Sequence, residues 1–274
     1  MIRNKAQNIA LRFINVLVNR LGTNELYDLI VFKAFEEKQS AHPNPLNKSK
    51  FYGFSQCDED GITLEILKRI GVKNGFFVEF GVGNGLENNT AILLAAGWKG
   101  AWFGGGNLKF TVKNSSKLKF TKVWIQRNNI CELYKSAAGN ADVVSLDLDG
   151  NDFYFADELL SNGVKPKLFI VEYNGKFPPS IEFKIEYSDT HTWTRDDYYG
   201  ASLATFNKMF ESHGYRLVCC STSGVNAFFV NNSFAEKFND VPNDISELYC
   251  EPFHFLRMHK KHPTSAKTME LLIS

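Results

Sequence analysis

Short apolar runs rich in β-forming residues recur along the chain, and longer helix-like stretches separate most of them. Strands joined by helix-length segments are typical of βαβ crossovers and a mainly parallel sheet. The last two runs, YRLVCC and NAFFVN, are joined by the short STSGV and can only form a hairpin. We therefore expect a doubly wound, Rossmann-like α/β sheet of about seven strands, mainly parallel, with a C-terminal antiparallel hairpin. The expected strands are 76–80, 101–103, 122–126, 143–148, 168–173, 215–220 and 227–230.

The first 50 residues have a different pattern. Ile9, Phe13 and Leu21 recur at helical spacing, which predicts an amphipathic helix, and a second helix is expected over 24–37. Two prolines and several polar residues over 40–50 indicate a linker. We expect a helical extension and linker at 1–50 and one catalytic domain at 51–274. The first helix either packs on its own domain, the favoured interpretation, or contacts a membrane surface, a partner or a second copy.

Composition narrows the functional classes. The chain has 44% hydrophobic and 14% aromatic residues. Its net charge of +1 is too small to attract a nucleic acid, so a nucleic-acid partner is not expected. Its five cysteines form no CxxC pair, which indicates a reducing cytoplasm rather than a disulfide framework. No apolar run is long enough for a signal peptide or a transmembrane helix. The expected partner is a small molecule or a glycan substrate.

The segment GFFVEFGVGNGLENNT, 75–90, places an acid and then three alternating glycines after an apolar strand. Glycines allow a tight turn and close approach of the backbone to a ligand, and the following helix start offers free N–H groups. Dinucleotide-binding enzymes favour GxGxxG with a later acid, so a nicotinamide-dependent oxidoreductase is disfavoured. A turn without a ligand remains the alternative.

The order E-x-G-x-G-x-G resembles the first motif of class I S-adenosylmethionine-dependent methyltransferases. The resemblance implies that Glu79 lies near the methionine amino group and that the glycine turn passes the ribose. Gln56 and Thr90 would contact the methionine end and Asn129 the adenine, although capping and solvent-exposed roles are equally open. The cofactor-binding candidates are Gln56, Glu79, Gly81, Gly83, Asn84, Gly85, Thr90, Asn129 and Asp147.

Acids gather after two neighbouring strands of the predicted sheet. DLDGND contains Asp147 and Asp149, and EYN contains Glu172 and Asn174. Carboxylates that converge at one sheet edge repel each other unless a cation lies among them, and oxygen ligands favour Mg²⁺. Alternatively, the aspartates cap the next helix. The arrangement resembles cation-dependent O-methyltransferases, which implies a metal on Asp147, Glu172 and Asn174. Tyr173 interrupts the usual adjacent pair.

The segments FSQCDEDGI, GWKGAWF, DLDGNDF and IVEYN together look like the FkbM-type methyltransferase group. The resemblance implies S-adenosylmethionine as the cofactor and methylation of a hydroxyl on a carbohydrate or a related biosynthetic intermediate. One position departs from the class I pattern, because Gly104 stands where an acid usually binds the ribose. Either another group such as Asn107 replaces this acid, or the chain is a degraded methyltransferase fold that serves as a binding or scaffold protein in glycan biosynthesis.

A long insertion, 175–202, follows the fifth predicted strand. Aromatic side chains interleaved with acids suit stacking on a sugar-like acceptor, and a histidine has a pKa suited to a base. The catalytic candidates are Asp147, Asp149 and His191, although a loop histidine is more often structural. The substrate candidates are Tyr173, Trp193, Tyr198 and Tyr199.

Overall fold

The computed structural model describes residues 23–49, 51–113, 115–137, 140–252 and 262–273. The chain divides into two compact units, Met1–Ala41 and His42–Ser274. In the first unit the described element is helix α2 (Thr23–Ala41). The expected helix near the N-terminus lies outside the described residues. No described helix combines the length and the apolar character needed to cross a bilayer.

The larger unit begins earlier than the expected boundary at residue 51. The predicted linker contains a 3₁₀ helix, η1 (Pro45–Lys48), with Asn44 as its N-cap. The side-chain amides of Asn44 and Asn47 donate to the carbonyls of Val218 and Cys220 at 2.8 Å each. Both asparagines are buried, so these hydrogen bonds replace the water that their amides lose. This short segment is therefore an integral part of the larger unit.

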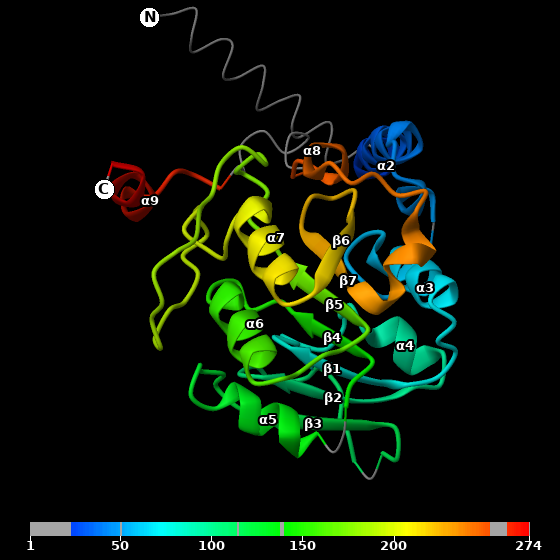
Figure 1. The fold of residues 1–274 in the computed structure, drawn as a ribbon, viewed down its shortest axis with the longest axis vertical. Coiled ribbons are helices and arrows are strands. Elements are labelled where there is room, and N and C mark those ends of the chain that lie inside the picture. The colour runs from blue at the N-terminus through cyan, green and yellow to red at the C-terminus, as the bar shows by residue number, and fades with distance from the viewer. Residues whose placement is uncertain (1–22, 50, 114, 138–139, 253–261, 274) are drawn as a thin grey trace, which may run out of the picture. The chain divides into compact units, whose positions relative to one another are not determined.

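Seven strands form one sheet in the order β3-β2-β1-β4-β5-β7-β6 (Figure 1). Strands β1 to β5 run parallel, whereas β7 is antiparallel to both β5 and β6. This topology confirms the predicted doubly wound sheet and its terminal hairpin. The strands are β1 (Phe76–Phe80), β2 (Lys99–Gly104), β3 (Leu118–Lys122), β4 (Val143–Leu146), β5 (Leu168–Glu172), β6 (Tyr215–Cys220) and β7 (Asn226–Asn231).

Helices cover both faces of this sheet. Figure 1 shows α5, α6 and α7 on one face and α3 and α4 on the other. Every residue of β4 is buried, as expected for a central strand covered on both faces. The helices of the larger unit are α3 (Glu59–Arg69), α4 (Ala91–Ala95), α5 (Ile130–Ser136), α6 (Asp152–Ser161), α7 (Leu203–Ser212), η2 (Asn232–Phe238), α8 (Ile245–Leu248) and α9 (Ala266–Ile273).

The third strand lies earlier in the sequence than predicted. It was expected over 122–126, the most apolar part of the region, but β3 comprises Leu118–Lys122. Trp124 follows the strand, is 52% exposed, and donates from Nε1 to the carbonyl of Asp189. Lysines within β3 are typical of an edge strand, where charge discourages pairing with another sheet. The strand was not predicted because its sequence, LKFTK, has few apolar residues.

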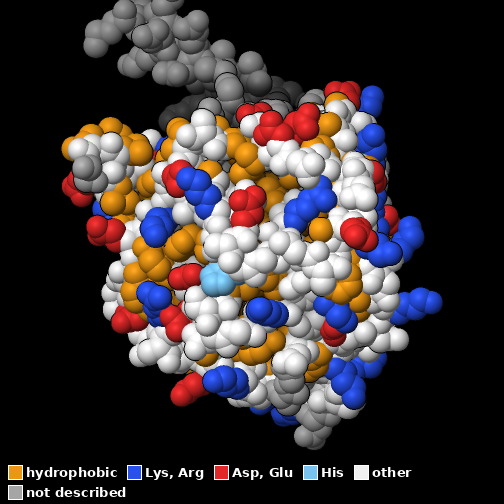
Figure 2. Space-filling view, viewed as in Figure 1, with side chains coloured by type: hydrophobic (Ala, Val, Ile, Leu, Met, Phe, Trp, Pro, Cys, Tyr) orange, Lys and Arg blue, Asp and Glu red, His pale blue; other side chains and the backbone are white. Residues whose placement is uncertain are grey.

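Surface charge is mixed on the face drawn in Figure 2, where lysine and arginine lie interspersed with aspartate and glutamate. This distribution agrees with the net charge of +1. Among the described residues, three acids, Asp147, Asp149 and Glu172, lie together after β4 and at the end of β5, where parallel α/β sheets place their ligands.

Candidate functional site

The glycine turn directly follows β1. Gly81, Gly83 and Gly85 have φ values of 95°, 51° and 83°, which side chains other than glycine rarely adopt. A Cβ at Gly81 would lie 1.7 Å from the carbonyl oxygen of Asp147. The turn is therefore pressed against the chain just beyond β4, and only glycine fits at its first position.

A cavity of about 390 Å³ opens beside this turn, and we call it the turn cavity. It brings the glycine turn and the acids after β4 and β5 into one space. Its lining residues are Gln56, Glu79, Gly81, Val82, Gly83, Asn84, Glu87, Asn88, Asp147, Asp149, Glu172, Trp193, Tyr199, Gly224, Val225 and His262.

Glu79 lines the turn cavity, and it also organises the start of α4. One carboxylate oxygen accepts from the backbone N–H of Asn89 at 3.0 Å. The other accepts from the N–H and hydroxyl of Thr90 at 3.2 and 2.5 Å. Burial raises the pKa of Glu79 above its usual value, although the hydrogen bonds from Thr90 oppose this. The acid thus ties the start of α4 to β1.

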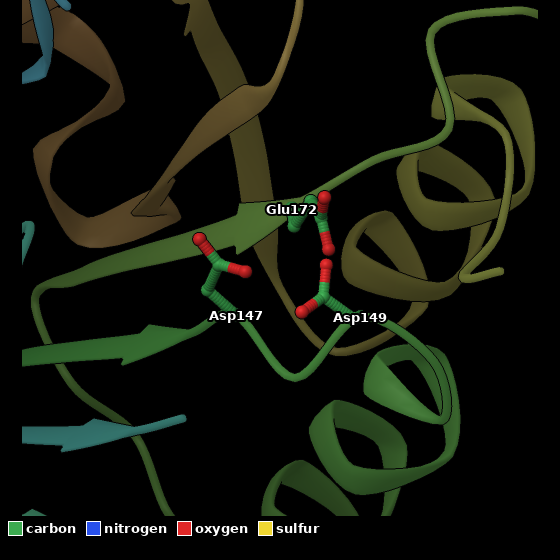
Figure 3. Close-up of side chains that lie close together, drawn as sticks. All are labelled: Asp147, Asp149 and Glu172. Carbon is green, nitrogen blue, oxygen red and sulfur yellow. The ribbon is translucent and has the colours of Figure 1, made fainter. Parts of the chain in front are cut away.

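Three carboxylates that line the cavity lie close together (Figure 3). Asp147 follows β4, Asp149 lies in the next turn with φ of 55°, and Glu172 ends β5. Each contributes an oxygen within 4.8 Å of the others. Oε2 of Glu172 is buried and has no hydrogen-bond partner among the described residues. A cation or a shared proton is needed between these groups.

Burial and mutual repulsion shift the titration of this acid cluster. Burial, followed by the charge of Asp152, raises the pKa of Asp147 well above its usual value. Burial, followed by the charge of Asp147, likewise raises the pKa of Glu172. Asp152 has a different role, because its carboxylate accepts from the N–H groups of Leu148 and Gly150 at 2.8 and 3.0 Å. It holds the loop that carries Asp149.

Two residues of the EYN segment do not contribute to this cluster. The Asn174 amide donates to the carbonyls of Asp197 and Tyr199, and its oxygen accepts from the N–H of Lys176. Its polar atoms are thus occupied by the insertion's backbone, and the third carboxylate comes from Asp149 instead. Tyr173 is only 1% exposed and donates to the carbonyl of Cys250, so it packs in the core rather than facing a substrate.

The insertion forms a wall between the turn cavity and a second cavity of about 710 Å³, the insertion cavity. Side chains along this wall are divided between the two spaces. Trp193 and Tyr199 line the turn cavity, whereas His191, Thr192, Thr194, Asp196 and Tyr198 line the insertion cavity. Three of the four predicted substrate residues, Trp193, Tyr198 and Tyr199, are therefore distributed over the two cavities.

His191 packs directly on the loop that carries Asp149. A Cβ at Gly150 would lie 2.3 Å from Cδ2 of His191, so a side chain at this position would displace the imidazole. Nε2 of His191 is buried without a hydrogen-bond partner among the described residues. Burial lowers the pKa of His191, so the imidazole is neutral near pH 7 and able to accept a proton.

An aromatic cluster lies on the wall of the turn cavity. The ring centroid of Trp193 lies 6.0 Å from the ring centroid of Tyr199 and 4.9 Å from that of His262. Burial, and then the negative charge of Glu172, raises the pKa of Tyr199 well above its usual value. Tyr199 and the three acids line the same cavity.

Some predicted cofactor residues line the turn cavity and others support it. Gln56, Glu79, Gly81, Gly83, Asn84 and Asp147 line it. Thr90 precedes α4, and its hydroxyl accepts from Nε1 of Trp102 in β2 at 2.8 Å. This contact connects the start of α4 to the sheet. Asn129 closes its own loop by accepting from the N–H of Gln126 and donating to the carbonyl of Trp124. Gly85 instead packs near Leu108 and Phe110.

Gly104, at the position of the missing ribose acid, packs against Val82 of the glycine turn. A Cβ at Gly104 would lie 3.2 Å from Cγ2 of Val82, and one at Gly106 would lie 2.6 Å from the carbonyl oxygen of Gly83. The end of β2 thus packs closely on the glycine turn. Asn107, the suggested substitute, accepts from Nζ of Lys122 at 2.7 Å and does not line the cavity.

Sequence reasoning missed several lining residues. Glu87 and Asn88 come two and three residues after Gly85, and their nearness to the glycine turn could have indicated a role. Gly224 and Val225 come from the hairpin between β6 and β7, and His262 comes from the segment before α9. No local motif marks these three, because distant parts of the chain bring them to the site.

Comparisons with known proteins give matches of fold only. No family model and no curated protein matches this chain. An O-methyltransferase family protein from Burkholderia thailandensis is 12% identical, with 57% of this chain and 50% of that chain covered and a TM-score of 0.34. The MycE methyltransferase of the mycinamycin biosynthetic pathway, in complex with Mg, SAH and mycinamycin VI, is 12% identical over 65% and 50% of the two chains, at a TM-score of 0.41.

Cofactor-bound Rv0187 from MTB is 13% identical, with 74% of this chain and 89% of that chain covered and a TM-score of 0.41. This chain spans half the length of the Burkholderia protein and of MycE. At these identities and TM-scores the matches do not bear on the chemistry of the site, which follows from its own residues.

Proposed function

We propose that this protein is an S-adenosylmethionine-dependent O-methyltransferase that acts on a hydroxyl of a carbohydrate or a related biosynthetic intermediate. One observation carries the proposal: a single cavity joins the glycine turn to three converging carboxylates. A tight turn with left-handed glycines lets the backbone approach a nucleoside closely. The acids lie where an acceptor hydroxyl would be oriented.

The proposed transfer requires few protein groups. The acceptor oxygen attacks the methyl carbon, the carbon–sulfur bond breaks with its electron pair left on sulfur, and the hydroxyl proton passes to a base. The protein mainly brings the two reactants together and excludes water. Asp149, which lines the turn cavity, is the proposed base, and His191, which lines the insertion cavity and packs on the loop that carries Asp149, is proposed to position this aspartate. Asp147 and Asp149 orient the hydroxyl.

The acid cluster suits a divalent cation such as Mg²⁺. Its donors are all oxygens, which hard cations prefer. The buried Oε2 of Glu172 has no hydrogen-bond partner among the described residues, so it is available as a ligand. Asp147, Asp149 and Glu172 would hold the ion in place of the set with Asn174. When bound, the ion would lower the pKa of an acceptor hydroxyl and orient its oxygen.

Metal binding can be measured without knowing the acceptor. A ligand that binds only the native state raises its stability, by about 2.7 kcal/mol at a concentration one hundred times its Kd. Saturating Mg²⁺ should therefore raise the Tm of the wild-type protein by several degrees, and Asp149→Asn should remove most of this shift. Asparagine tolerates the left-handed backbone at this position.

Asp189→Asn is the matched control, because this aspartate is exposed and does not line the turn cavity. It should keep the full Mg²⁺ shift. An unchanged Tm of the wild-type protein at saturating Mg²⁺ and Mn²⁺ would contradict the cation and leave the carboxylates to bind the hydroxyl directly.

The acceptor class is supported by the insertion. Trp193 and Tyr199 offer ring faces beside the acids, as sugar-binding sites often do. The insertion cavity beyond His191 is lined by hydroxyl side chains such as Ser188, Thr190 and Thr192, which suit hydrogen bonding to a polyol.

The alternative is a scaffold protein that retains the fold but no longer binds the methyl donor, and the glycine at position 104 is the observation that favours it. A thermal-shift panel of S-adenosylhomocysteine, nicotinamide dinucleotides and Mg²⁺ separates the classes. The proposed enzyme is stabilised by S-adenosylhomocysteine, an oxidoreductase by a dinucleotide, and the scaffold by neither nucleotide.

A further inference from the structure

The turn cavity has a strongly unbalanced charge. Five carboxylates line it, and the described lining residues include no lysine or arginine. None of the ion pairs formed by described lysine and arginine side chains involves these five acids. The acids are Glu79, Glu87, Asp147, Asp149 and Glu172. The space therefore favours a positively charged occupant.

An independent feature of the same cavity points to a cation. Tyr199 is only 7% exposed, and Oε2 of Glu172, which lines the same cavity, is buried without a hydrogen-bond partner among the described residues. Its ring and that of Trp193 form the cavity wall beside the acid cluster. The face of an aromatic ring attracts a cation, and it does so more strongly where water is excluded.

We infer that this cavity prefers a positively charged methyl donor, an inference that rests on the proposed function. It should bind S-adenosylmethionine, a sulfonium ion, more tightly than the product S-adenosylhomocysteine, which is a thioether and carries no charge on its sulfur. The two molecules differ at the sulfur by one methyl group and one positive charge. A unit charge held in a cavity lined by several carboxylates gains more free energy than the contact of one methyl group provides. Loss of that charge on transfer would favour product release.

The test is calorimetric titration of the full chain, in EDTA, with S-adenosylmethionine, S-adenosylhomocysteine and sinefungin, whose protonated amine replaces the sulfonium. The charged pair should bind about tenfold more tightly than S-adenosylhomocysteine. Sinefungin separates the effect of charge from that of the methyl group. Equal affinities, or tighter binding of S-adenosylhomocysteine, would overturn the inference and leave the proposed function intact.

Substitution of single acids tests whether the carboxylates cause the preference for a charged ligand. Glu172→Gln should reduce the charged-to-neutral affinity ratio to about threefold or less, because it removes one carboxylate from the cluster. Glu182→Gln, an exposed acid paired with Lys208 outside the cavity, should leave the ratio unchanged. The ratio compares ligands on one variant, so a loss of folded protein does not alter it. If none of the ligands binds wild-type protein, the proposed function fails and this inference fails with it.

Discussion

Alanine at Gly81 is expected to lower the stability of the fold by at least about 4 kcal/mol, the range reached when a substitution forces overlap with backbone. The new Cβ would lie 1.7 Å from the carbonyl oxygen of Asp147, and the φ of 95° disfavours any side chain. The backbone at Gly81 and the backbone at Asp147 must therefore move apart. Thermal unfolding should show a Tm lower by about 10 °C or more, with loss of S-adenosylhomocysteine binding.

Gly83 provides the matched control in the same turn. Its φ is 51°, but a Cβ there would meet no atom within 4 Å. Gly83→Ala should therefore cost only about 1 kcal/mol, the usual penalty of a left-handed residue with a side chain. Similar Tm values for the two variants would contradict the close contact between the turn and Asp147.

The second large effect is expected at Glu79. Glu79→Leu removes the acceptor for the N–H of Asn89 and for the N–H and hydroxyl of Thr90. Buried donors without a partner cost about 1 to 3 kcal/mol each, partly offset by the cost of burying the original carboxylate. A net loss of about 2 to 4 kcal/mol should appear in urea unfolding as a lower midpoint with an unchanged slope.

Glu79→Gln separates the charge from the hydrogen bonds. The amide oxygen can still accept from Asn89, but the amide nitrogen faces the N–H of Thr90. We expect intermediate stability. If the leucine variant is as stable as wild type, Glu79 does not organise the turn, and the acid would have to act on the ligand alone.

Much of the fold followed from the alternation of apolar runs and helices. The central strands were predictable because their residues are apolar on both faces, as in Val143–Leu146. The hairpin was predictable because STSGV is too short for a crossover. The edge strand Leu118–Lys122 was not, because an edge needs few apolar residues and carries lysines.

The candidate site was predictable where it depends on strand ends. Parallel strands bring the residues that follow them to one edge, so Asp147 and Glu172 could be expected to meet. Asn174 could not be assigned, since beyond Glu172 the chain leaves the sheet and its amide binds the insertion's backbone. His262 joins the cavity from the segment before α9, a contact that depends on tertiary structure alone.

Calorimetric titration of S-adenosylhomocysteine into the wild-type chain tests the central claim most directly. The turn cavity should bind one molecule, with a heat signal that Gly81→Ala abolishes and that Glu182→Gln, outside the cavity, retains. Absence of binding by wild-type protein at millimolar ligand, with the protein folded by circular dichroism, would contradict the assignment of a methyl-donor site to this cavity.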